Sequence, residues 1–477
     1  MKRLSLCFAL FFLVAPLSLF AGCSSQKENN VYRISAQFSE NTLTSSMQFT
    51  FYNDEETALS FLCFNLYGNA YREGAQYPPL TASQASAYYN GKSYGDMEIL
   101  SVSPCKGWEV CGEDENILRV DLEKELFPEE SVTVNIEYVL TLAQVEHRTG
   151  AAKRSVNLGN FYPVLCAYEE GKGFYECVYS SNGDPFYSEC ADYEVTLTTD
   201  AGYVAASSGQ AVSATRQGGK LVTEYELKNA RDFALVLSEE YELYQTQAEG
   251  VQILYYAYEE ENAGQMLELL SDCISYFSDT FGDFPYKTYS AVQTGFCFGG
   301  MEYPALVYLS DSLSREEYLY TAVHETAHQW WYAAVGNNEC EHAFLDEGLA
   351  EYSSYLFFSE YKEYGTDAAA LLKRAHSACN ALVSVQEQVF GEADTTMDRP
   401  LSEYGGYEYV VIAYDKGMLL FDALRDAVGD SAFFSSLRRY YAQNKGKIAT
   451  PASLAAAFKN AGASGVIASF VDGTAIV

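Results

Sequence analysis

The chain has 477 residues, of which 48% are hydrophobic, and a formal net charge of −35. This length exceeds that of one ordinary domain, so we expect two domains once a leader has been removed. Nucleic-acid binding depends on cations that neutralise phosphates, so a chain this acidic is not expected to bind nucleic acid.

The first residues are typical of an export signal. A basic start precedes an apolar run over residues 4–20, and Ala-Gly-Cys-Ser-Ser follows. A membrane-spanning helix is the alternative, but the run is marginal in length. The end of the run resembles a bacterial lipobox, although Phe20 stands where an aliphatic residue is usual. We therefore predict a lipoprotein signal peptide over residues 1–22, lipidation of Cys23 and a linker over 23–31, with the protein anchored on the extracytoplasmic side of a bacterial membrane.

The next part of the chain, residues 32–246, has the alternation of polar and apolar residues that is typical of strands. Turn-forming segments separate the alternating runs, for example at residues 181–185. We expect an antiparallel, β-rich N-terminal domain. Its expected strands include residues 32–38, 131–138, 193–198, 220–227 and 233–237.

Helical periodicity dominates the second domain, which we expect to cover residues 247–477. A strand over residues 251–256 and a helix over 261–281 come first, and helices prevail from Ser314 onward. The sequence therefore predicts an α+β protein of two domains.

The chain holds 12 cysteines, two of which, Cys7 and Cys23, fall in the leader region. A CxxC pair is absent from the sequence, so a zinc site made of cysteines is not expected. Cys105 and Cys111 could close a short loop, whereas burial as small apolar residues is the alternative for most of the others. Export permits disulfides without requiring them, so the sequence leaves the disulfide pattern open.

The most informative motif is His-Glu-Thr-Ala-His. Ser314 and Glu317 form a capping-box signature before it, and Gly336 after it is a helix stop signal. These signals place the motif on a helix, so His324 and His328 should lie one turn apart on one face. A surface helix with two incidental histidines is the alternative.

A catalytic zinc site takes three protein ligands and leaves one position for water. Glu347 follows His328 after 18 intervening residues, which allows a helix end, a loop and the start of a second helix. We therefore expect His324, His328 and Glu347 to bind one Zn²⁺ per chain. Glu325 would accept the proton of the activated water and pass it to the leaving amine.

Three motifs together resemble the zinc aminopeptidase family that includes aminopeptidase N and the leukotriene-converting hydrolase. HETAHQWW precedes DEGLAEY at the family's spacing, GGMEYP resembles the family's GAMEN strand, and Tyr-Asp-Lys-Gly resembles its YxKG helix start. The resemblance implies a β-saddle first domain and a thermolysin-like catalytic domain. We expect a minimal two-domain member with a more open cleft.

The resemblance also assigns roles to individual residues. Glu302 would bind the substrate's α-ammonium group, and Gly299, Gly300 and Met301 would bring backbone close to the substrate. Tyr414 would donate its hydroxyl to the oxyanion of the tetrahedral intermediate.

Some residues depart from the family's pattern. Gly300 and Tyr303 replace the Ala and Asn of GAMEN, and Asp346 replaces the Asn that usually precedes the ligand glutamate. We expect the glycine to have a mild effect and the tyrosine to alter the side pocket. Glu351, one turn after Glu347, would accept a hydrogen bond from a ligand histidine, the alternative being a glutamate on the helix surface.

The sequence therefore predicts a zinc metalloaminopeptidase that hydrolyses the N-terminal peptide bond of peptides with a free N-terminus. A zinc endopeptidase or dipeptidase is one alternative, and Glu302 argues against the endopeptidase. A catalytically silent peptide-binding protein on the cell surface is another, and the presence of Glu325 and Tyr414 argues against it. Epoxide hydrolysis occurs in one branch of the family and stays open, as do the side-chain preference, the physiological substrate and the oligomeric state.

Overall fold

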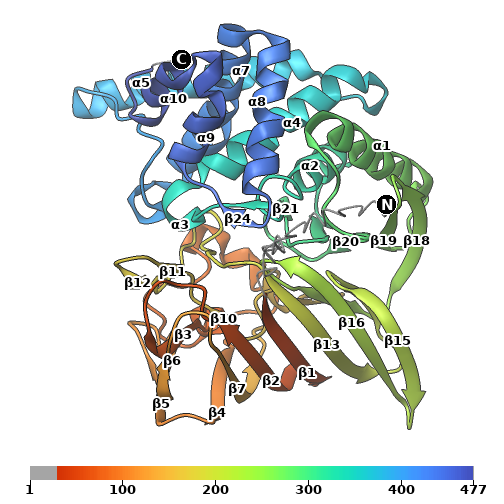
Figure 1. Cartoon of the computed structure of the whole chain (residues 1–477). Helices are drawn as coiled ribbons and strands as arrows, with labels where there is room; N and C mark the ends of the chain where they lie inside the picture. Colours follow the sequence, from red (N-terminus) through yellow and green to blue (C-terminus); the bar gives the residue numbers. More distant parts are fainter. Residues whose placement is uncertain (1–28, 476–477) are drawn as a thin grey trace, which may run out of the picture.

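The computed structural model describes residues 29–475, so the predicted leader and Cys23 lie outside the described residues. Figure 1 shows a β-rich part formed by the N-terminal half of the chain and a mainly helical part formed by the C-terminal half. The order of the elements confirms the predicted class, a β-rich domain followed by a mainly helical one.

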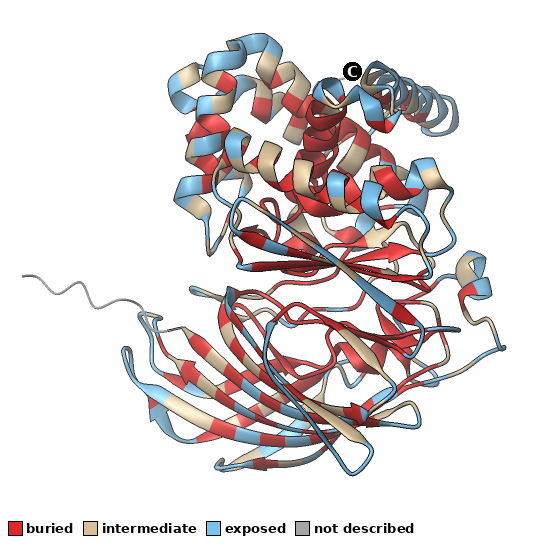
Figure 2. Cartoon of the chain, turned by 90° about the vertical axis from the view of Figure 1, so that its right-hand side faces the viewer, coloured by how far each residue is buried: buried red, intermediate tan, exposed pale blue. Residues whose placement is uncertain are grey.

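A seven-stranded sheet is the largest element of the N-terminal domain. Side chains alternate between buried and more exposed positions along most of its strands, as in β1, because one face packs on the core, whereas the edge strand β15 is exposed throughout (Figure 2). The sheet is mixed rather than purely antiparallel, since β1 and β13 run parallel while the other neighbours are antiparallel. In spatial order the strands are β15 (Gln210–Gln217), β16 (Lys220–Ala230), β13 (Ala191–Asp200), β1 (Asn30–Ser39), β2 (Thr42–Tyr52), β7 (Ser131–Thr141) and β4 (Asp96–Ser103).

Three smaller sheets complete the described part of this domain. One sheet has the order β10 (Val164–Leu165), β3 (Leu59–Asn65), β6 (Ile117–Leu126), β5 (Gly107–Cys111). A second has the order β14 (Val204–Ser207), β17 (Leu235–Ser238), β9 (Val156–Leu158), β8 (Thr149–Ala151), and a hairpin pairs β11 (Tyr168–Glu169) with β12 (Gly173–Phe174). The five strands expected from the sequence correspond to β1, β7, β13, β16 and β17.

A five-stranded sheet begins the second domain. Its order is β18 (Tyr241–Ala248), β19 (Val251–Tyr258), β20 (Thr288–Thr294), β22 (Leu306–Ser310), β21 (Gly300–Met301). The predicted boundary between residues 246 and 247 therefore falls inside β18. The edge strand β21 contains two residues of the GGMEYP motif and pairs antiparallel with β22.

Helices pack on this sheet and form the second hydrophobic core. They are α1 (Ala263–Phe281), α2 (Arg315–Ala327), α3 (Glu339–His342), α4 (Phe344–Glu360), α5 (Ala368–Phe390), α6 (Gly406–Tyr409), α7 (Gly417–Val428), α8 (Asp430–Asn444), α9 (Pro451–Phe458) and α10 (Ser464–Val471). A short π-helix, Val410–Lys416, leads into α7, and β23 (Val335–Gly336) pairs with β24 (Lys447–Ile448).

Two glycines let α4 and α7 approach each other closely. A Cβ atom on Gly348 would lie 2.7 Å from the Cα of Gly417, so a side chain at either position would force the helices apart. Because Glu347 precedes the first glycine and Tyr414 lies one turn before the second, this contact brings the two residues to the same place.

Candidate active site

The predicted metal ligands come together between α2 and α4. The side chain of Ser314 accepts a hydrogen bond from the backbone of Glu317, so the predicted capping box starts α2. The helix ends at Ala327, well before Gly336, which lies in β23 instead. His328 is the C-terminal cap of this helix and remains one turn from His324.

The geometry of the cluster is compact. The Nε2 atoms of His324 and His328 lie 3.1 Å apart, and Oε2 of Glu347 lies 3.4 Å and 3.3 Å from them, respectively. All three side chains are buried. Burial opposes ionisation of Glu347, but the two adjacent histidines outweigh it and lower its pKa to about 2. The cluster thus brings two imidazole nitrogens and one ionised carboxylate oxygen to one point. This set of donor atoms fits Zn²⁺.

Neighbouring groups orient the two imidazole rings. Nδ1 of His328 lies 2.9 Å from the carbonyl oxygen of Trp331, so Nδ1–H donates there and leaves Nε2 for the metal. Nδ1 of His324 lies 3.6 Å from Glu351, within ion-pair range but too far for a hydrogen bond. Glu351 also accepts a hydrogen bond from Tyr320 and lies 3.5 Å from the guanidinium of Arg374, which hold it in this place.

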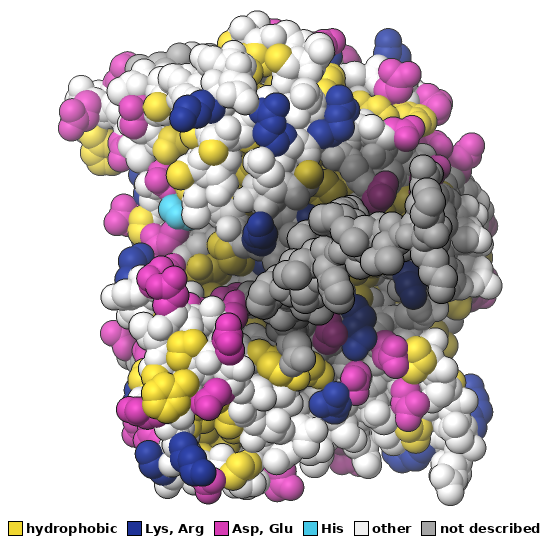
Figure 3. All heavy atoms as spheres, viewed as in Figure 1, with side chains coloured by type: hydrophobic (Ala, Val, Ile, Leu, Met, Phe, Trp, Pro, Cys, Tyr) yellow, Lys and Arg dark blue, Asp and Glu magenta, His cyan; other side chains and the backbone are white. Residues whose placement is uncertain are grey.

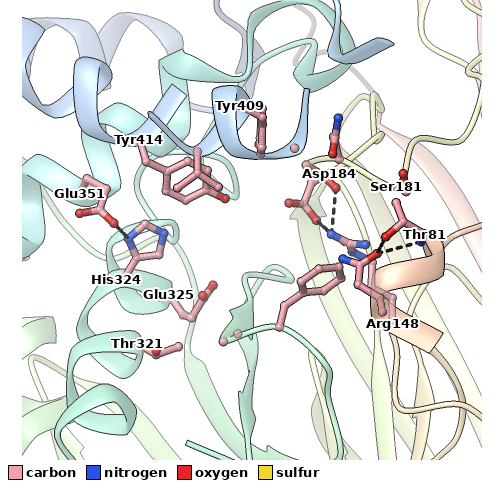
Figure 4. A pocket seen from close by; sticks show the side chains of 18 of the residues that line it. Thr81, Arg148, Ser181, Asp184, Thr321, His324, Glu325, Glu351, Tyr409 and Tyr414 are labelled. Atoms are coloured by element: carbon pink, nitrogen blue, oxygen red, sulfur yellow. Dashed lines mark hydrogen bonds and ion pairs between the residues drawn. The ribbon is translucent and has the colours of Figure 1, made fainter. Parts of the chain in front are cut away.

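Glu325 lies on α2 between the two histidines and lines the cavity (Figure 4). Burial raises the pKa of its carboxyl group to about 7, although the two histidines oppose this effect. The backbone of Gly300 packs directly against it, since a Cβ atom there would lie 2.4 Å from Oε1 of Glu325. The missing side chain of this glycine thus makes room for Glu325, and the expectation that the glycine has only a mild effect stays a prediction.

The rest of the GGMEYP motif divides between the cavity wall and the interior. Gly299 and Gly300 line the cavity, whereas Met301 and Glu302 are 1% and 3% exposed. Tyr303 is fully buried, and its hydroxyl donates to Asn160 in the N-terminal domain at 3.3 Å. The tyrosine therefore joins the two domains instead of shaping a side pocket.

Glu302 is a buried carboxylate beside the metal cluster, within 4.8 Å of the donor atoms of His328 and Asp346. Among residues 29–475, no group makes a hydrogen bond to its Oε1 atom. Burial, and then the nearby carboxylate of Asp184, raise the pKa of Glu302 well above its usual range. Within residues 29–475, no cation hydrogen-bonds to Oε1 of Glu302, and a ligand cation would supply that partner.

The sequence did not identify Asp184 as a site residue; its segment predicted only a turn. Asp184 lies in the N-terminal domain, lines the cavity and forms an ion pair of 2.5 Å with Arg148. Nε of Arg148 also lies 3.3 Å from the sulfur of Met301, which ties this pair to the GGMEYP segment. A wall of the cavity therefore comes from a domain that carries none of the recognised motifs.

Tyr414 lies on the π-helix and faces the cavity opposite Glu325 (Figure 4). Its hydroxyl donates a hydrogen bond to Glu347, and its ring stacks on that of His324 with centroids 5.9 Å apart. Lys416, in the same segment, is buried and donates to the carbonyl oxygens of Thr395 and Phe470 at 2.7 and 3.1 Å. The lysine therefore anchors the segment that presents Tyr414.

The cavity between the domains has a volume of about 660 Å³. Residues of both domains line it, including Thr81 and Asp184 from the first and His324, Glu325 and Tyr414 from the second (Figure 4). On the face seen in Figure 3, acidic and basic side chains are scattered over both domains without a continuous basic patch. This volume suits a small ligand or the end of a peptide.

Comparisons with known proteins agree with this geometry. Residues 265–473 match the peptidase family M1 domain. Aminopeptidase O from Rattus norvegicus and from Mus musculus are each 24% identical to the chain over 198 residues, which is 37% of this chain and only 24% of each relative. The chain thus matches about a quarter of the length of these curated relatives.

Solved structures show the same fold over nearly the whole chain. An M1 zinc metallopeptidase from Deinococcus radiodurans has a TM-score of 0.65 and 18% identity, with 94% of this chain and 95% of that chain covered. A mutant of that enzyme bound to the substrate Tyr-Ser-Ala has a TM-score of 0.64 and 17% identity, with the same coverage. A two-domain M1 zinc metallopeptidase mutant bound to L-arginine has a TM-score of 0.65 and 18% identity, again with 94% and 95% covered.

Proposed function

From the match of residues 265–473 to the peptidase family M1 domain, we propose that the protein is a zinc-dependent aminopeptidase. The observation that carries the proposal is a three-ligand metal cluster with a buried carboxylate beside it, one oxygen of which has no hydrogen-bond partner among the described residues. His324, His328 and Glu347 would hold one zinc ion, and Glu302 would hold the substrate's N-terminus.

Zinc in this position would polarise the scissile carbonyl and lower the pKa of water, so that a nucleophile is available near neutral pH. Glu325 borders the cavity and would accept the proton of the attacking water. The same carboxyl group would then pass that proton to the leaving amine.

Tyr414 would stabilise the negative charge that develops on the carbonyl oxygen. Its ring stacks on His324, and its hydroxyl already reaches Glu347, so it lies next to the reaction centre. In the substrate complex the hydroxyl would turn from Glu347 to the oxyanion. A preorganised donor of this kind stabilises the transition state more than the bound substrate.

The position of cleavage would follow from recognition of the α-ammonium group. Glu302 lies beside the metal cluster, and Asp184 lies near it on the cavity wall. Asp184 on the cavity wall and Glu302 buried behind it are two carboxylates that favour a cation there, although Arg148 already balances the charge of Asp184. A substrate anchored by its N-terminus presents its first peptide bond to the metal.

A panel of fluorogenic aminoacyl substrates, each with an N-acetylated counterpart, would test this function. We expect hydrolysis of the free-amine substrates, its loss with phenanthroline and its return with added zinc. An endopeptidase would instead cleave blocked peptides at internal bonds, and a peptide-binding protein would cleave neither. Either result would overturn the aminopeptidase proposal.

The proposed location is the extracytoplasmic side of a bacterial membrane, through a lipid on Cys23. The proposal rests on the order of basic, apolar and small residues at the start of the sequence. In the part of the chain that the structure describes, no helix is long and apolar enough to cross a membrane. Mass spectrometry of the N-terminal peptide tests the proposal: we expect a diacylated Cys23, and an unmodified Met1 would contradict it.

A further inference from the structure

Two cysteines meet at the contact between the domains. Sγ of Cys177, in the N-terminal domain, lies 3.0 Å from Sγ of Cys340, which belongs to α3 of the catalytic domain. Their side chains are buried, with 2% and 8% exposure. One residue along, Glu341 accepts a hydrogen bond of 2.7 Å from the hydroxyl of Tyr175, so the two segments are already joined beside the sulfur atoms.

The backbone around Cys177 is fixed by further contacts. Asn116 donates to its carbonyl oxygen at 2.7 Å, and its N–H donates to Asn65 at 3.3 Å. Its sulfur also lies 2.9 Å from the carbonyl oxygen of Pro185. Since a disulfide has an S–S distance of about 2.05 Å, a shift of roughly 1 Å would bring the two sulfur atoms to bonding distance. The sequence suggested a different pair, Cys105 with Cys111. In the structure, the thiol of Cys105 instead donates to the carbonyl oxygen of Val102 at 3.3 Å.

We propose that Cys177 and Cys340 form a disulfide that joins the two domains at the side of the active site. The oxidant would be a donor disulfide, either a small molecule or a thiol–disulfide oxidoreductase. One cysteine thiolate attacks the donor's S–S bond and releases one donor thiol; the second cysteine then attacks the mixed disulfide and releases the other. The two cysteines together lose two electrons and two protons. The two sulfur atoms of the donor gain these electrons and protons and leave as thiols.

The bond would constrain both walls of the cavity. Asp184 follows Cys177 by seven residues, and Glu347 follows Cys340 by seven. Each cysteine thus lies shortly before a residue of the proposed site in its own domain. A covalent bond between the two cysteines would limit separation of the domains beside the cavity. The export proposed above would place the chain in a compartment where disulfides persist.

The experiment uses the full chain, refolded or incubated with oxidised glutathione and then digested without reduction. We expect a linked pair of peptides containing Cys177 and Cys340, two hydrogen atoms lighter than the sum of the separate peptides. Fragmentation of the linked pair must separate Cys177 from Cys190, because trypsin leaves both in one peptide. Reduction with a phosphine should lower the melting temperature, on the order of 5 °C, because the bond closes a long loop.

Controls separate this bond from other effects of the reductant. The variant Cys177→Ser/Cys340→Ser should melt at the same temperature with and without reductant, and Cys105→Ser should behave like wild type. If the double variant does not fold, the peptide map and the melting curves of the wild type still decide. Recovery of both cysteines as alkylated thiols after oxidation, or an unchanged melting temperature on reduction of the linked protein, would overturn the proposal. None of these readouts is an enzymatic rate, so the result is independent of the proposed function.

Discussion

Replacement of Glu302 by glutamine tests how the proposed enzyme selects the N-terminus of its substrate. Glutamine keeps the shape of the side chain and removes its charge. Glu302 is 3% exposed, and within the described residues its Oε1 atom has no hydrogen-bond partner. The substrate's ammonium group would therefore supply both a hydrogen bond and a compensating charge.

The size of the effect follows from that contact. A hydrogen bond to a charged group contributes about 1.5–3 kcal/mol. Since about 1.4 kcal/mol corresponds to a factor of ten, Glu302→Gln should lower kcat/KM for free-amine substrates by roughly 10- to 200-fold. Asp184 stays in place in this variant, so some preference for a cation should remain.

The assay compares one aminoacyl substrate with its N-acetylated form, for wild type and variant. Wild type should scarcely cleave the acetylated form. In the variant, the ratio of kcat/KM for the free-amine substrate to kcat/KM for the acetylated substrate should be smaller. Glu339→Gln is the matched control, because Glu339 is another glutamate buried near the site, with 1% exposure, and belongs to none of the recognised motifs. A Glu302→Gln enzyme with full zinc and an unchanged ratio would refute the assignment of Glu302.

Three further predictions concern the metal and the reaction. Alanine at His324, His328 or Glu347 should remove most of the bound zinc measured by elemental analysis, since each supplies one of three ligands; full occupancy in Glu347→Ala would contradict the ligand set. Glu325→Gln should keep zinc and lower turnover by about 10²–10⁴-fold in steady-state assays, whereas a near-normal rate would exclude it as the general base. Tyr414→Phe should lower kcat much more than it raises KM, because its hydrogen bond would form mainly in the transition state; the opposite pattern would make it a ground-state contact.

The features that the sequence predicted correctly depend on short-range patterns. The capping box at Ser314 and the spacing between His324 and His328 are properties of one helix, so periodicity and local signals were sufficient. The place of Glu347 was accessible because 18 intervening residues allow a helix end, a loop and the start of a second helix; in the structure this stretch also contains β23 and α3. The alternation in residues 32–38 likewise predicted β1 within two residues at each end.

What the sequence did not predict depends on how distant segments pack. Asp184 reaches the site from the N-terminal domain, 118 residues before Glu302, and only the docking of the two domains brings them together. The same docking determines the contact between Cys177 and Cys340. The parallel pairing of β1 with β13 is also long-range, since alternation along a strand does not specify the direction of its neighbour.

Gly300 offers a last prediction, because it departs from the alanine of the family's GAMEN pattern. A Cβ atom at this position would lie 2.4 Å from Oε1 and 2.6 Å from Cγ of Glu325, so the whole glutamate side chain would have to move. Displacement of a reacting group by about 1 Å can cost about 10²-fold in rate. We therefore expect Gly300→Ala to lower kcat by roughly 10- to 100-fold, with zinc content and melting temperature unchanged.

Gly299→Ala provides the matched control for this change. A Cβ atom on Gly299 would lie 3.4 Å from the hydroxyl oxygen of Thr321, at the edge of ordinary van der Waals contact, so its effect on kcat should be small. If both variants lose activity equally, the loss comes from stiffening of the strand and not from displacement of Glu325. If Gly300→Ala retains wild-type kcat, Glu325 does not need the space that this glycine leaves, and the alanine of the related enzymes is equivalent here.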